Sequence, residues 1–262
     1  MKLAIHGATG RMGLSVARLA HAAGDIQIVG AVCSSADPAE GRDIGELAGI
    51  GPIGVLASSD LGAGLLGAEV LIDFSTASAM PGLLALAARQ KVAIVSGTTN
   101  LDAAGRHALD KAAESVAVLW AANMSLGVQV LAELVQQALR RLGLGYDVEI
   151  VEAHHRRKLD SPSGTALRLA DAVKQVRQDA RFLPGREGEV GRRTDEEVAI
   201  LAIRGGDVIG DHTVHLLGQG ERLELTHRAS SRDLFAHGAL SSARFLRQKS
   251  AGLYSIADVL SS

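Results

Sequence analysis

A short apolar strand followed by a glycine turn and a helix opens this chain, and it constrains the fold more than any other feature. Lys2–His6 has the pattern of a strand, Gly7–Gly13 contains three glycines, and Leu14–Ala23 has helical periodicity. Glycines at such a turn let the backbone approach a pyrophosphate, whose charge is met by the amides that begin the helix. The pattern therefore predicts a dinucleotide site. A tight turn without a ligand is the alternative interpretation.

The alternation of strands and helices continues through the first half of the chain. Further apolar runs lie at 26–32, 70–74, 92–95 and 116–120, and Ala- and Leu-rich helical stretches at 81–90 and 103–115 separate some of them. This rhythm is typical of a parallel sheet covered on both faces. We expect an α/β, Rossmann-like domain over residues 1–125.

The remainder of the chain predicts a second domain of α+β type. A helix is expected over 126–142, a strand over 146–153, a second helix from near Ser163, and strands from Glu197, over 208–217 and over 222–227. Turns at 205–207 and 218–220 suggest that the last three strands form an antiparallel meander, so the sheet is expected to be largely antiparallel. The glycine-rich segment 184–194 has the composition of a mobile surface loop. Residues 126–233 would form this domain, and the segment 234–262 would pack back on the first.

Composition and charge exclude several classes of partner. The net charge is −2, from 27 basic and 29 acidic residues, so no overall basic field attracts nucleic acid or anionic lipid. Aromatic residues make up 3% of the chain, too few for a base-stacking platform. Cys33 is the single cysteine, which excludes an intramolecular disulfide and fits a reducing, cytoplasmic location. The apolar run before Gly7 is too short for a signal peptide or a membrane span.

A histidine-bearing basic segment is the main candidate for chemistry. His154 and His155 end a predicted strand, and Arg156, Arg157 and Lys158 follow. Adjacent strand residues point to opposite faces, so the two histidines are poorly placed to share a metal ion, and we expect no metal site. The helix start at Ser163–Thr165, together with these cations, predicts an anion pocket that fits a phosphate or a carboxylate. A solvated basic turn leading into a capped helix is the alternative.

With the glycine turn and the histidine segment together, the chain resembles the 4-hydroxy-tetrahydrodipicolinate reductase family, also called dihydrodipicolinate reductases, of lysine and diaminopimelate biosynthesis. The matching motifs are GATGRMG at 7–13, IDFS at 72–75, GTT at 97–99, AANMS at 121–125, EAHHRRKLDSPSGTA at 152–166, RGGD at 204–207 and LTHRASS at 225–231. The segment 152–166 is the most specific of them, and the resemblance covers essentially the whole chain.

The resemblance implies a reaction and its residues. After the 4-hydroxyl is lost as water, a nicotinamide cofactor would deliver a hydride to C4 of the resulting conjugated ring, converting 4-hydroxy-tetrahydrodipicolinate to tetrahydrodipicolinate. His154 would be the proton donor, and Lys158 would support the reacting substrate. The substrate's carboxylates would be bound by His155, Ser163, Gly164 and Thr165. The cofactor would be bound by Gly7, Ala8, Thr9, Gly10, Arg11, Met12, Cys33, Ser34, Gly97, Thr98, Thr99, Ala121, Ala122, Asn123 and Met124. The resemblance also implies a homotetramer assembled through the second domain's sheet, and closure of the two domains.

Cofactor preference rests on the end of the second strand. An acid about 20 residues after the glycines usually accepts from the adenosine ribose, but Cys33 and Ser34 stand where some family members carry Glu-Arg, and the first acid is Asp37. Without a carboxylate to repel a 2'-phosphate, NADPH should be accepted, with Arg11 or Arg42 as charge partner. NADH also stays open.

Two other functions share part of this sequence pattern. An aspartate-semialdehyde dehydrogenase also uses a GxxGxxG loop but needs a cysteine nucleophile, and Cys33 is misplaced for that role. A non-catalytic nucleotide sensor on the same fold would not need both His154 and Lys158 in an anion pocket.

Overall fold

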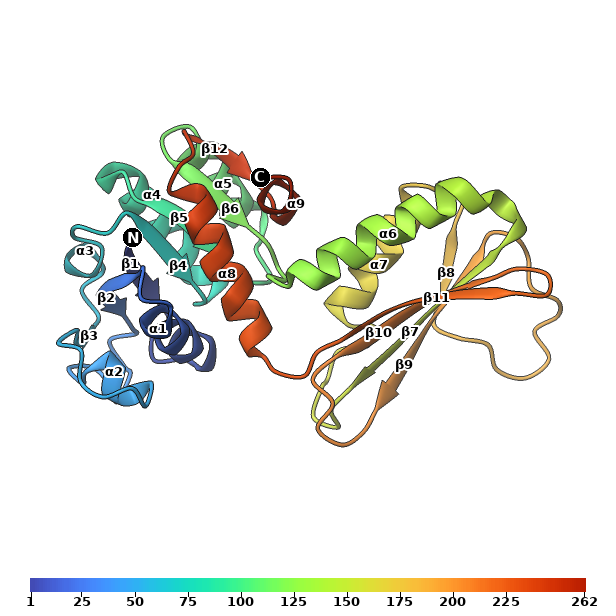
Figure 1. Cartoon of the computed structure of the whole chain (residues 1–262), viewed down its shortest axis with the longest axis horizontal. Helices are drawn as coiled ribbons and strands as arrows, with labels where there is room; N and C mark the ends of the chain where they lie inside the picture. Colours follow the sequence, from blue (N-terminus) through green and yellow to red (C-terminus); the bar gives the residue numbers. More distant parts are fainter. The chain divides into compact units, whose positions relative to one another are not determined.

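The computed structural model describes residues 1–262 and divides into two compact units (Figure 1). Unit 1 comprises Met1–Ser125 and Asp233–Ser262, and unit 2 comprises Leu126–Arg232. Unit 1 is therefore discontinuous in sequence, because the chain leaves it after residue 125 and returns at residue 233. No helix combines the length and the apolar character needed to cross a bilayer.

Unit 1 is built on a seven-stranded sheet in which every neighbouring pair is parallel. Its strands are β1 (Lys2–His6), β2 (Gln27–Val32), β3 (Ala57–Ser58), β4 (Val70–Asp73), β5 (Ala93–Ser96), β6 (Ala117–Trp120) and β12 (Gly252–Tyr254). They lie in the order β12-β6-β5-β4-β1-β2-β3. The order changes direction at β1, and the carboxyl ends of strands at such a switch point are where α/β folds bind ligands.

Helices cover both faces of this sheet. They are α1 (Arg11–Ala23), α2 (Ile44–Leu47), α3 (Leu61–Gly64), α4 (Met80–Gln90), α5 (Ala103–Ala113), α8 (Asp233–Leu246) and α9 (Ile256–Leu260), with a 3-10 turn at Ala77–Ala79. Helix α8 packs beside α1 against β4 and β5, whereas α4 and α5 pack together. The Rossmann-like fold that the sequence predicted is confirmed.

Unit 2 combines two helices with a five-stranded sheet. Its elements are α6 (Leu126–Leu142), a 3-10 turn (Gly143–Gly145), β7 (Asp147–His154), α7 (Gly164–Lys174), β8 (Arg181–Leu183), β9 (Glu197–Arg204), β10 (Asp211–Leu217) and β11 (Arg222–Arg228). Burial alternates along β7, with Val148 and Ile150 fully buried beneath α6 and α7. Both helices cover the same face of the sheet, and no helix of this unit covers the other face (Figure 1).

The α+β character of unit 2 is confirmed, but the predicted meander of its last three strands is wrong. The strand order is β11-β10-β7-β9-β8, so β7 lies between β9 and β10. Strand β10 is antiparallel to β7 and β11, and β9 is parallel to β7 and β8. The connection from β9 to β10 passes across the end of β7, where Gly205 N donates to His154 O and His155 N donates to Val208 O. This crossing places residues of β9 and β10 on either side of the histidine segment.

The predicted loop 184–194 is anchored to the sheet by two arginines. Arg186 pairs with Glu149 and Glu197, and Arg193 pairs with Asp147 and Glu149. These contacts tie the loop to β7 and β9 at the end of the sheet opposite the histidine segment.

A stability prediction follows from a close contact between α8 and the end of the first segment of unit 1. A Cβ added to Gly238 would lie 1.7 Å from the carbonyl oxygen of Met124, whereas one added to Gly82 in α4 meets no atom within 4 Å. Gly238→Ala should therefore lower the free energy of unfolding of unit 1 by about 1–3 kcal/mol, the usual cost of overpacking. The matched change Gly82→Ala should raise it by up to about 1 kcal/mol, because alanine favours a helix.

Urea unfolding followed by the fluorescence of Trp120, the only tryptophan and a unit 1 residue, measures both variants. Equal effects of the two substitutions would contradict the close packing of α8.

Candidate active site

The buried Glu152 carboxylate organises the site in unit 2. Strand periodicity places Glu152 and His154 on the same, inward face of β7, where they are 0% and 8% exposed. Oε2 of Glu152 lies 2.5 Å from Nδ1 of His154. A carboxylate can only accept at neutral pH, so Nδ1 carries the hydrogen and Nε2 of His154 is left as the nitrogen for other partners.

Arg204 neutralises this buried carboxylate. It ends β9, in register with His154, and its two terminal nitrogens donate to the two oxygens of Glu152, both at 2.8 Å. This bidentate geometry is the strongest form of an arginine–carboxylate pair. Arg204 also donates to the carbonyl oxygen of Asp160 at 2.7 Å, which fixes the far end of the basic loop.

The same carboxylate holds the start of α7. Ser163 N donates to Oε1 of Glu152 at 3.1 Å, and the Ser163 hydroxyl caps the helix by accepting from Ala166 N at 3.2 Å. The hydroxyl is also hydrogen-bonded to Nε2 of His212, at 3.1 Å. Because His212 lies opposite Glu152 in β10, the histidine and the start of α7 are fixed to the same sheet position.

Burial and charge set the protonation of this cluster. Burial raises the pKa of Glu152, but the hydrogen bonds from Arg204 and His154 outweigh it and leave that pKa below its usual value. Burial lowers the pKa of His154 despite the opposing effect of Glu152, and the charges of Lys158 and Arg204 lower it further. Burial lowers the pKa of His212 to about 4. Both imidazoles are therefore neutral at pH 7.

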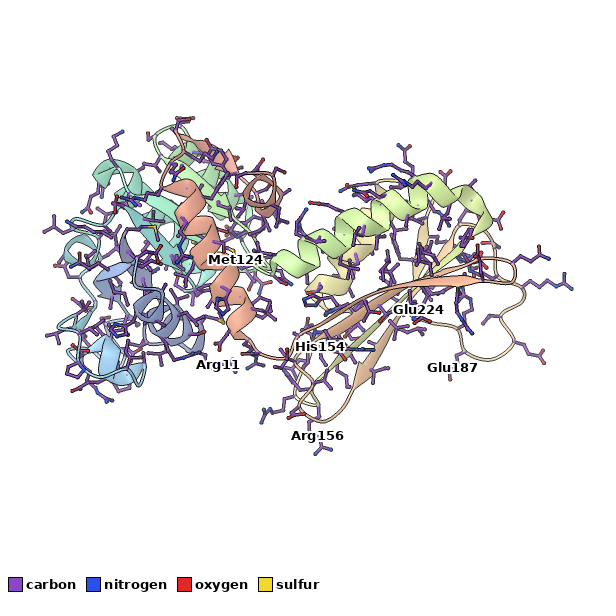
Figure 2. The ribbon with its side chains drawn as sticks, in the orientation of Figure 1. Arg11, Met124, His154, Arg156, Glu187 and Glu224 are labelled. Atoms are coloured by element: carbon purple, nitrogen blue, oxygen red, sulfur yellow. The ribbon has the colours of Figure 1, made fainter.

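The charged side chains in and around the basic loop after β7 have different partners. Lys158 Nζ lies 2.8 Å from Asp160 Oδ1, and the hydrogen bond from Lys158 lowers the pKa of Asp160. His155 lies on the other side of the chain from His154, with its Nε2 3.3 Å from a terminal nitrogen of Arg232. Arg156 extends outward from this loop (Figure 2). Of the predicted substrate residues, Gly164 is exposed and Thr165 is partly buried, both in the first turn of α7.

A metal-ligand geometry exists at the same place. Ligand atoms of Glu152, His154 and His212 lie within 4.8 Å of one another. However, the two Glu152 oxygens already accept from Arg204, whose guanidinium supplies the positive charge that a bound cation would bring. His155, the other histidine of the motif, is not part of this group.

The glycine loop of unit 1 is shaped for an anion. Gly7 has φ +70°, and a Cβ there would lie 2.5 Å from Phe74 O. A Cβ on Gly13 would lie 2.3 Å from Gly7 O, so the loop and the first turn of α1 can pack closely only without side chains. Helix α1 starts after Gly10 with no side-chain cap and no acidic residue in its first turn. Its first amides and positive dipole end therefore suit a pyrophosphate.

A second buried carboxylate fixes the strand ends around this loop. Asp73 is fully buried at the end of β4 and accepts from His6 Nδ1 at 2.8 Å, and from the Ser96 and Thr98 hydroxyls at 2.7 Å each. Burial raises the pKa of Asp73, but these hydrogen bonds leave it lowered. Trp120 donates to Thr98 O at 2.8 Å. The ends of β1, β4, β5 and β6 are thus held together.

The other predicted cofactor residues lie along the same strand ends. A Cβ on Gly97 would come within 2.2 Å of the Phe74 ring, which explains glycine at that position. Ala121, Ala122, Asn123 and Met124 follow β6 directly, and Thr99 follows Thr98 in the loop after β5. Ala8, Met12 and Arg11 belong to the glycine loop and the start of α1, and Cys33 and Ser34 follow β2. Arg11 is exposed there (Figure 2).

Sequence reasoning missed three partners of His154. Glu152 had a local signal, because it precedes His154 by two residues and so shares its strand face. Arg204 lies in the RGGD motif, but no local signal linked it or His212 to His154, since that proximity depends on the order of the strands. Arg232, the partner of His155, directly follows the LTHRASS motif, which ends at Ser231, but was not among the predicted site residues.

Comparison with known proteins gives full-length matches. Residues 1–124 match the family model described as "Dihydrodipicolinate reductase, N-terminus", and residues 127–260 match "Dihydrodipicolinate reductase, C-terminus". A 4-hydroxy-tetrahydrodipicolinate reductase of Anaeromyxobacter sp. (strain Fw109-5) is 45% identical over 263 residues, covering 99% of this chain and 97% of the relative. One from Cupriavidus pinatubonensis (strain JMP 134 / LMG 1197) is 44% identical, covering 99% of each.

Solved structures share the fold at lower sequence identity. A dipicolinate-bound dihydrodipicolinate reductase from Paenisporosarcina sp. TG-14 is 22% identical, with a TM-score of 0.77 and 97% of each chain covered. An amine dehydrogenase from Mycobacterium smegmatis is 14% identical, with a TM-score of 0.62, covering 98% of this chain and 95% of the other. At these identities the likeness is one of fold.

The Glu152 network generates a prediction for stability. Glu152→Gln removes the charge that Arg204 and His154 share, and should lower the free energy of unfolding by about 2–4 kcal/mol at pH 7, somewhat less than the loss of a fully buried pair because Arg204 is partly exposed. The pKa of Glu152 is lowered by folding, so its stabilisation is present above the unfolded value, about 4.3, and is lost as the pH falls below it. The difference between the two proteins should therefore shrink as the pH is lowered from 7 through about 4.3 towards the lower pKa of the folded state.

Urea unfolding followed by circular dichroism at several pH values measures this difference. The control is Glu187→Gln in the exposed loop at the opposite end of the sheet (Figure 2), which should change stability by less than about 0.5 kcal/mol. A pH-independent effect of Glu152→Gln would show that its charge is not what stabilises the site.

Proposed function

The chain belongs to the dihydrodipicolinate reductase family, and from this premise we propose that it catalyses the nicotinamide-dependent reduction of 4-hydroxy-tetrahydrodipicolinate to tetrahydrodipicolinate in lysine and diaminopimelate biosynthesis. The family membership supports an oxidoreductase of this pathway. The observation that carries the assignment of residues is the hydrogen bond between Glu152 and His154, which presents a buried imidazole next to a lysine and an anion-binding helix start.

His154 is the proposed proton donor. Its Nδ1 is engaged by Glu152, so Nε2 is the nitrogen that exchanges the proton. A Cβ on Gly210 would lie 3.1 Å from this Nε2, and glycine therefore keeps the nitrogen open. The free site holds a neutral imidazole because burial and the nearby cations lower its pKa. A bound dicarboxylate brings two negative charges, which raise the pKa of His154 and favour the protonated form that acts as acid.

Lys158 and the start of α7 bind the substrate's carboxylates in this proposal. Lys158 has an exposed carboxylate, Asp160, as its present partner, and a substrate carboxylate can take the place of Asp160. The amides of Gly164 and Thr165 lie in the first turn of α7, where the helix dipole favours an anion. His155 lies beside Arg232 and can receive the second carboxylate. These groups orient the substrate and stabilise its charge.

The cofactor is NADPH or NADH, bound by unit 1. The uncapped start of α1 fits its pyrophosphate, as argued above. When bound, the reduced nicotinamide would supply a hydride to C4 of the substrate ring once the 4-hydroxyl has left as water, and His154 gives the proton that balances the negative charge on the ring-nitrogen side. The Asp73 network keeps Thr98 and the glycine loop in fixed positions for it, and Asn123 and Met124 complete the proposed contacts from the end of β6.

Assembly into a homotetramer is part of the proposal. The sheet face of unit 2 that no helix of the unit covers carries the exposed apolar side chains of Leu201 and Ile203, with Leu223 also exposed on β11. Such side chains on an open sheet are suited to burial against a second copy.

The cytoplasmic location stays a prediction from the single cysteine.

A direct assay tests the function. Product of dihydrodipicolinate synthase is supplied in a coupled reaction, and nicotinamide absorbance is followed with NADH and NADPH in parallel. Substrate-dependent oxidation of either cofactor is expected. Cofactor binding without oxidation would favour the nucleotide sensor instead.

Two substitutions test the roles of the site residues. His154→Gln and Lys158→Ala should each lower kcat by at least about a hundredfold, the scale expected for an acid or a charge-stabilising group, while cofactor binding stays nearly intact. The control is Arg156→Ala, which removes an exposed cation of the same loop whose side chain extends outward, and it should keep kcat within about twofold (Figure 2). Turnover like that of the unsubstituted enzyme in both variants would disprove the mechanism.

A further inference from the structure

A carboxylate stands beside the glycine loop, although the sequence places none at the end of the second strand. Asp37 lies in the loop after β2, and its Oδ2 accepts a hydrogen bond from Thr9 Oγ1 at 2.5 Å. Thr9 is part of the glycine loop, at the position where the commoner fingerprint has its second glycine. Asp37, which comes later in the chain, therefore takes the place of the acid that is missing from the end of β2.

The loop after β2 folds back on itself and holds Asp37 in this place. Asp37 N donates to Ser34 O, and Glu40 N donates to Asp37 O, both at 3.0 Å. The second carboxylate oxygen of Asp37 accepts from Ala39 N at 2.9 Å. Two successive turns and a side-chain hydrogen bond thus fix the carboxylate, which is partly buried.

The electrostatic environment of the loop is negative. Burial raises the pKa of Cys33, and the charges of Asp37 and Glu40 raise it further, so both carboxylates act on the end of β2. The hydrogen bond from Thr9 lowers the pKa of Asp37, which keeps it ionised at neutral pH, and no cation contributes to that shift. Arg11 and Arg42, the two candidates for a phosphate partner, are exposed, and neither forms an ion pair with Asp37.

We propose that Asp37 recognises the ribose hydroxyls of the cofactor's adenosine and excludes a 2'-phosphate, so that the enzyme takes NADH in preference to NADPH. A carboxylate has about four acceptor positions, and Thr9 and Ala39 use one on each oxygen, so each oxygen can still accept from a ribose hydroxyl. A 2'-phosphate at the same position would meet two negative side chains. This inference rests on the proposed function, because it assigns one end of the cofactor proposed there. It contradicts the acceptance of NADPH expected from Cys33 and Ser34 and decides the choice left open between the two cofactors in favour of NADH.

Binding measurements separate this role from a purely structural one. Isothermal titration calorimetry of the whole protein with NADH and with NADPH, without substrate, gives the ratio of the two dissociation constants. Asp37→Asn keeps an acceptor for Thr9 but removes the charge. Asp110→Asn, on the exposed side of α5, is the matched control for a lost negative charge.

The unsubstituted protein should bind NADH at least about tenfold more tightly than NADPH. Asp37→Asn should reduce that ratio at least about tenfold, with tighter NADPH binding as part of the change, while Asp110→Asn leaves it unchanged. Thermal unfolding of each variant checks that the loop is still folded. If Asp37→Asn is unstable, the two dissociation constants are measured with Asp37→Ser in its place. The inference is overturned if the unsubstituted protein binds the two cofactors equally, or if removing the Asp37 charge leaves their ratio the same.

The same experiment distinguishes this inference from the proposed function. A normal NADH preference that depends on Asp37, together with no turnover in the coupled assay, would support the assignment of Asp37 and refute the reductase activity. Absence of binding by either cofactor would refute both.

Discussion

The buried carboxylate of Glu152 is the interaction on which the site in unit 2 depends. An isolated charge in the protein interior costs several kcal/mol. Glu152 is stable there because four N–H groups donate to it, and two of them belong to the positively charged guanidinium of Arg204. Those donors come from β7, from β9 and from the start of α7. The imidazole and the helix start therefore share one point of attachment, and their separation is set by the sheet rather than by a flexible loop.

Unit 1 uses a buried carboxylate in a comparable way. Asp73 accepts from His6, Ser96 and Thr98, which belong to the ends of neighbouring strands and the loop after one of them. Its partners are two hydroxyls and an imidazole, whereas Glu152 has a permanent cation. In both units the acid lies at the carboxyl end of a central strand and positions residues of the candidate site, while the acid itself stays out of contact with solvent.

Periodicity predicted what is local in this chain. The bounds of β1 and α6 were predicted to the residue, because each is a single uninterrupted pattern with a clear change of composition at its ends. The short elements β3, β8, α2 and α3 were missed, since two to four residues carry no measurable period. The meander was predicted wrongly because the glycine turn between β9 and β10 suggested that these two strands are neighbours, whereas β7 lies between them.

The residues of the candidate site likewise divide into those that the local sequence predicted and those that it did not. The histidine segment and the glycine loop were recognised because their residues are contiguous, whereas Arg204 and His212 reach His154 only through the strand order. Asp37 shows a third case: its distance along the chain argued against a role beside the glycine loop, but two turns shorten that distance in space. Loop conformation of this kind has no periodic signature in the sequence.

The discontinuity of unit 1 has a consequence for the order in which the two units can be completed during synthesis. Once residue 232 has left the ribosome, every strand and helix of unit 2 is available, so this unit can fold to completion. Unit 1, although its first strand is made first, still lacks α8, which packs against α1, β4 and β5, and the edge strand β12, which pairs with β6. The nascent chain therefore holds the sheet of unit 1 with α1 but not α8 on one face until residues 233–262 have emerged, and the unit whose synthesis starts first is completed last.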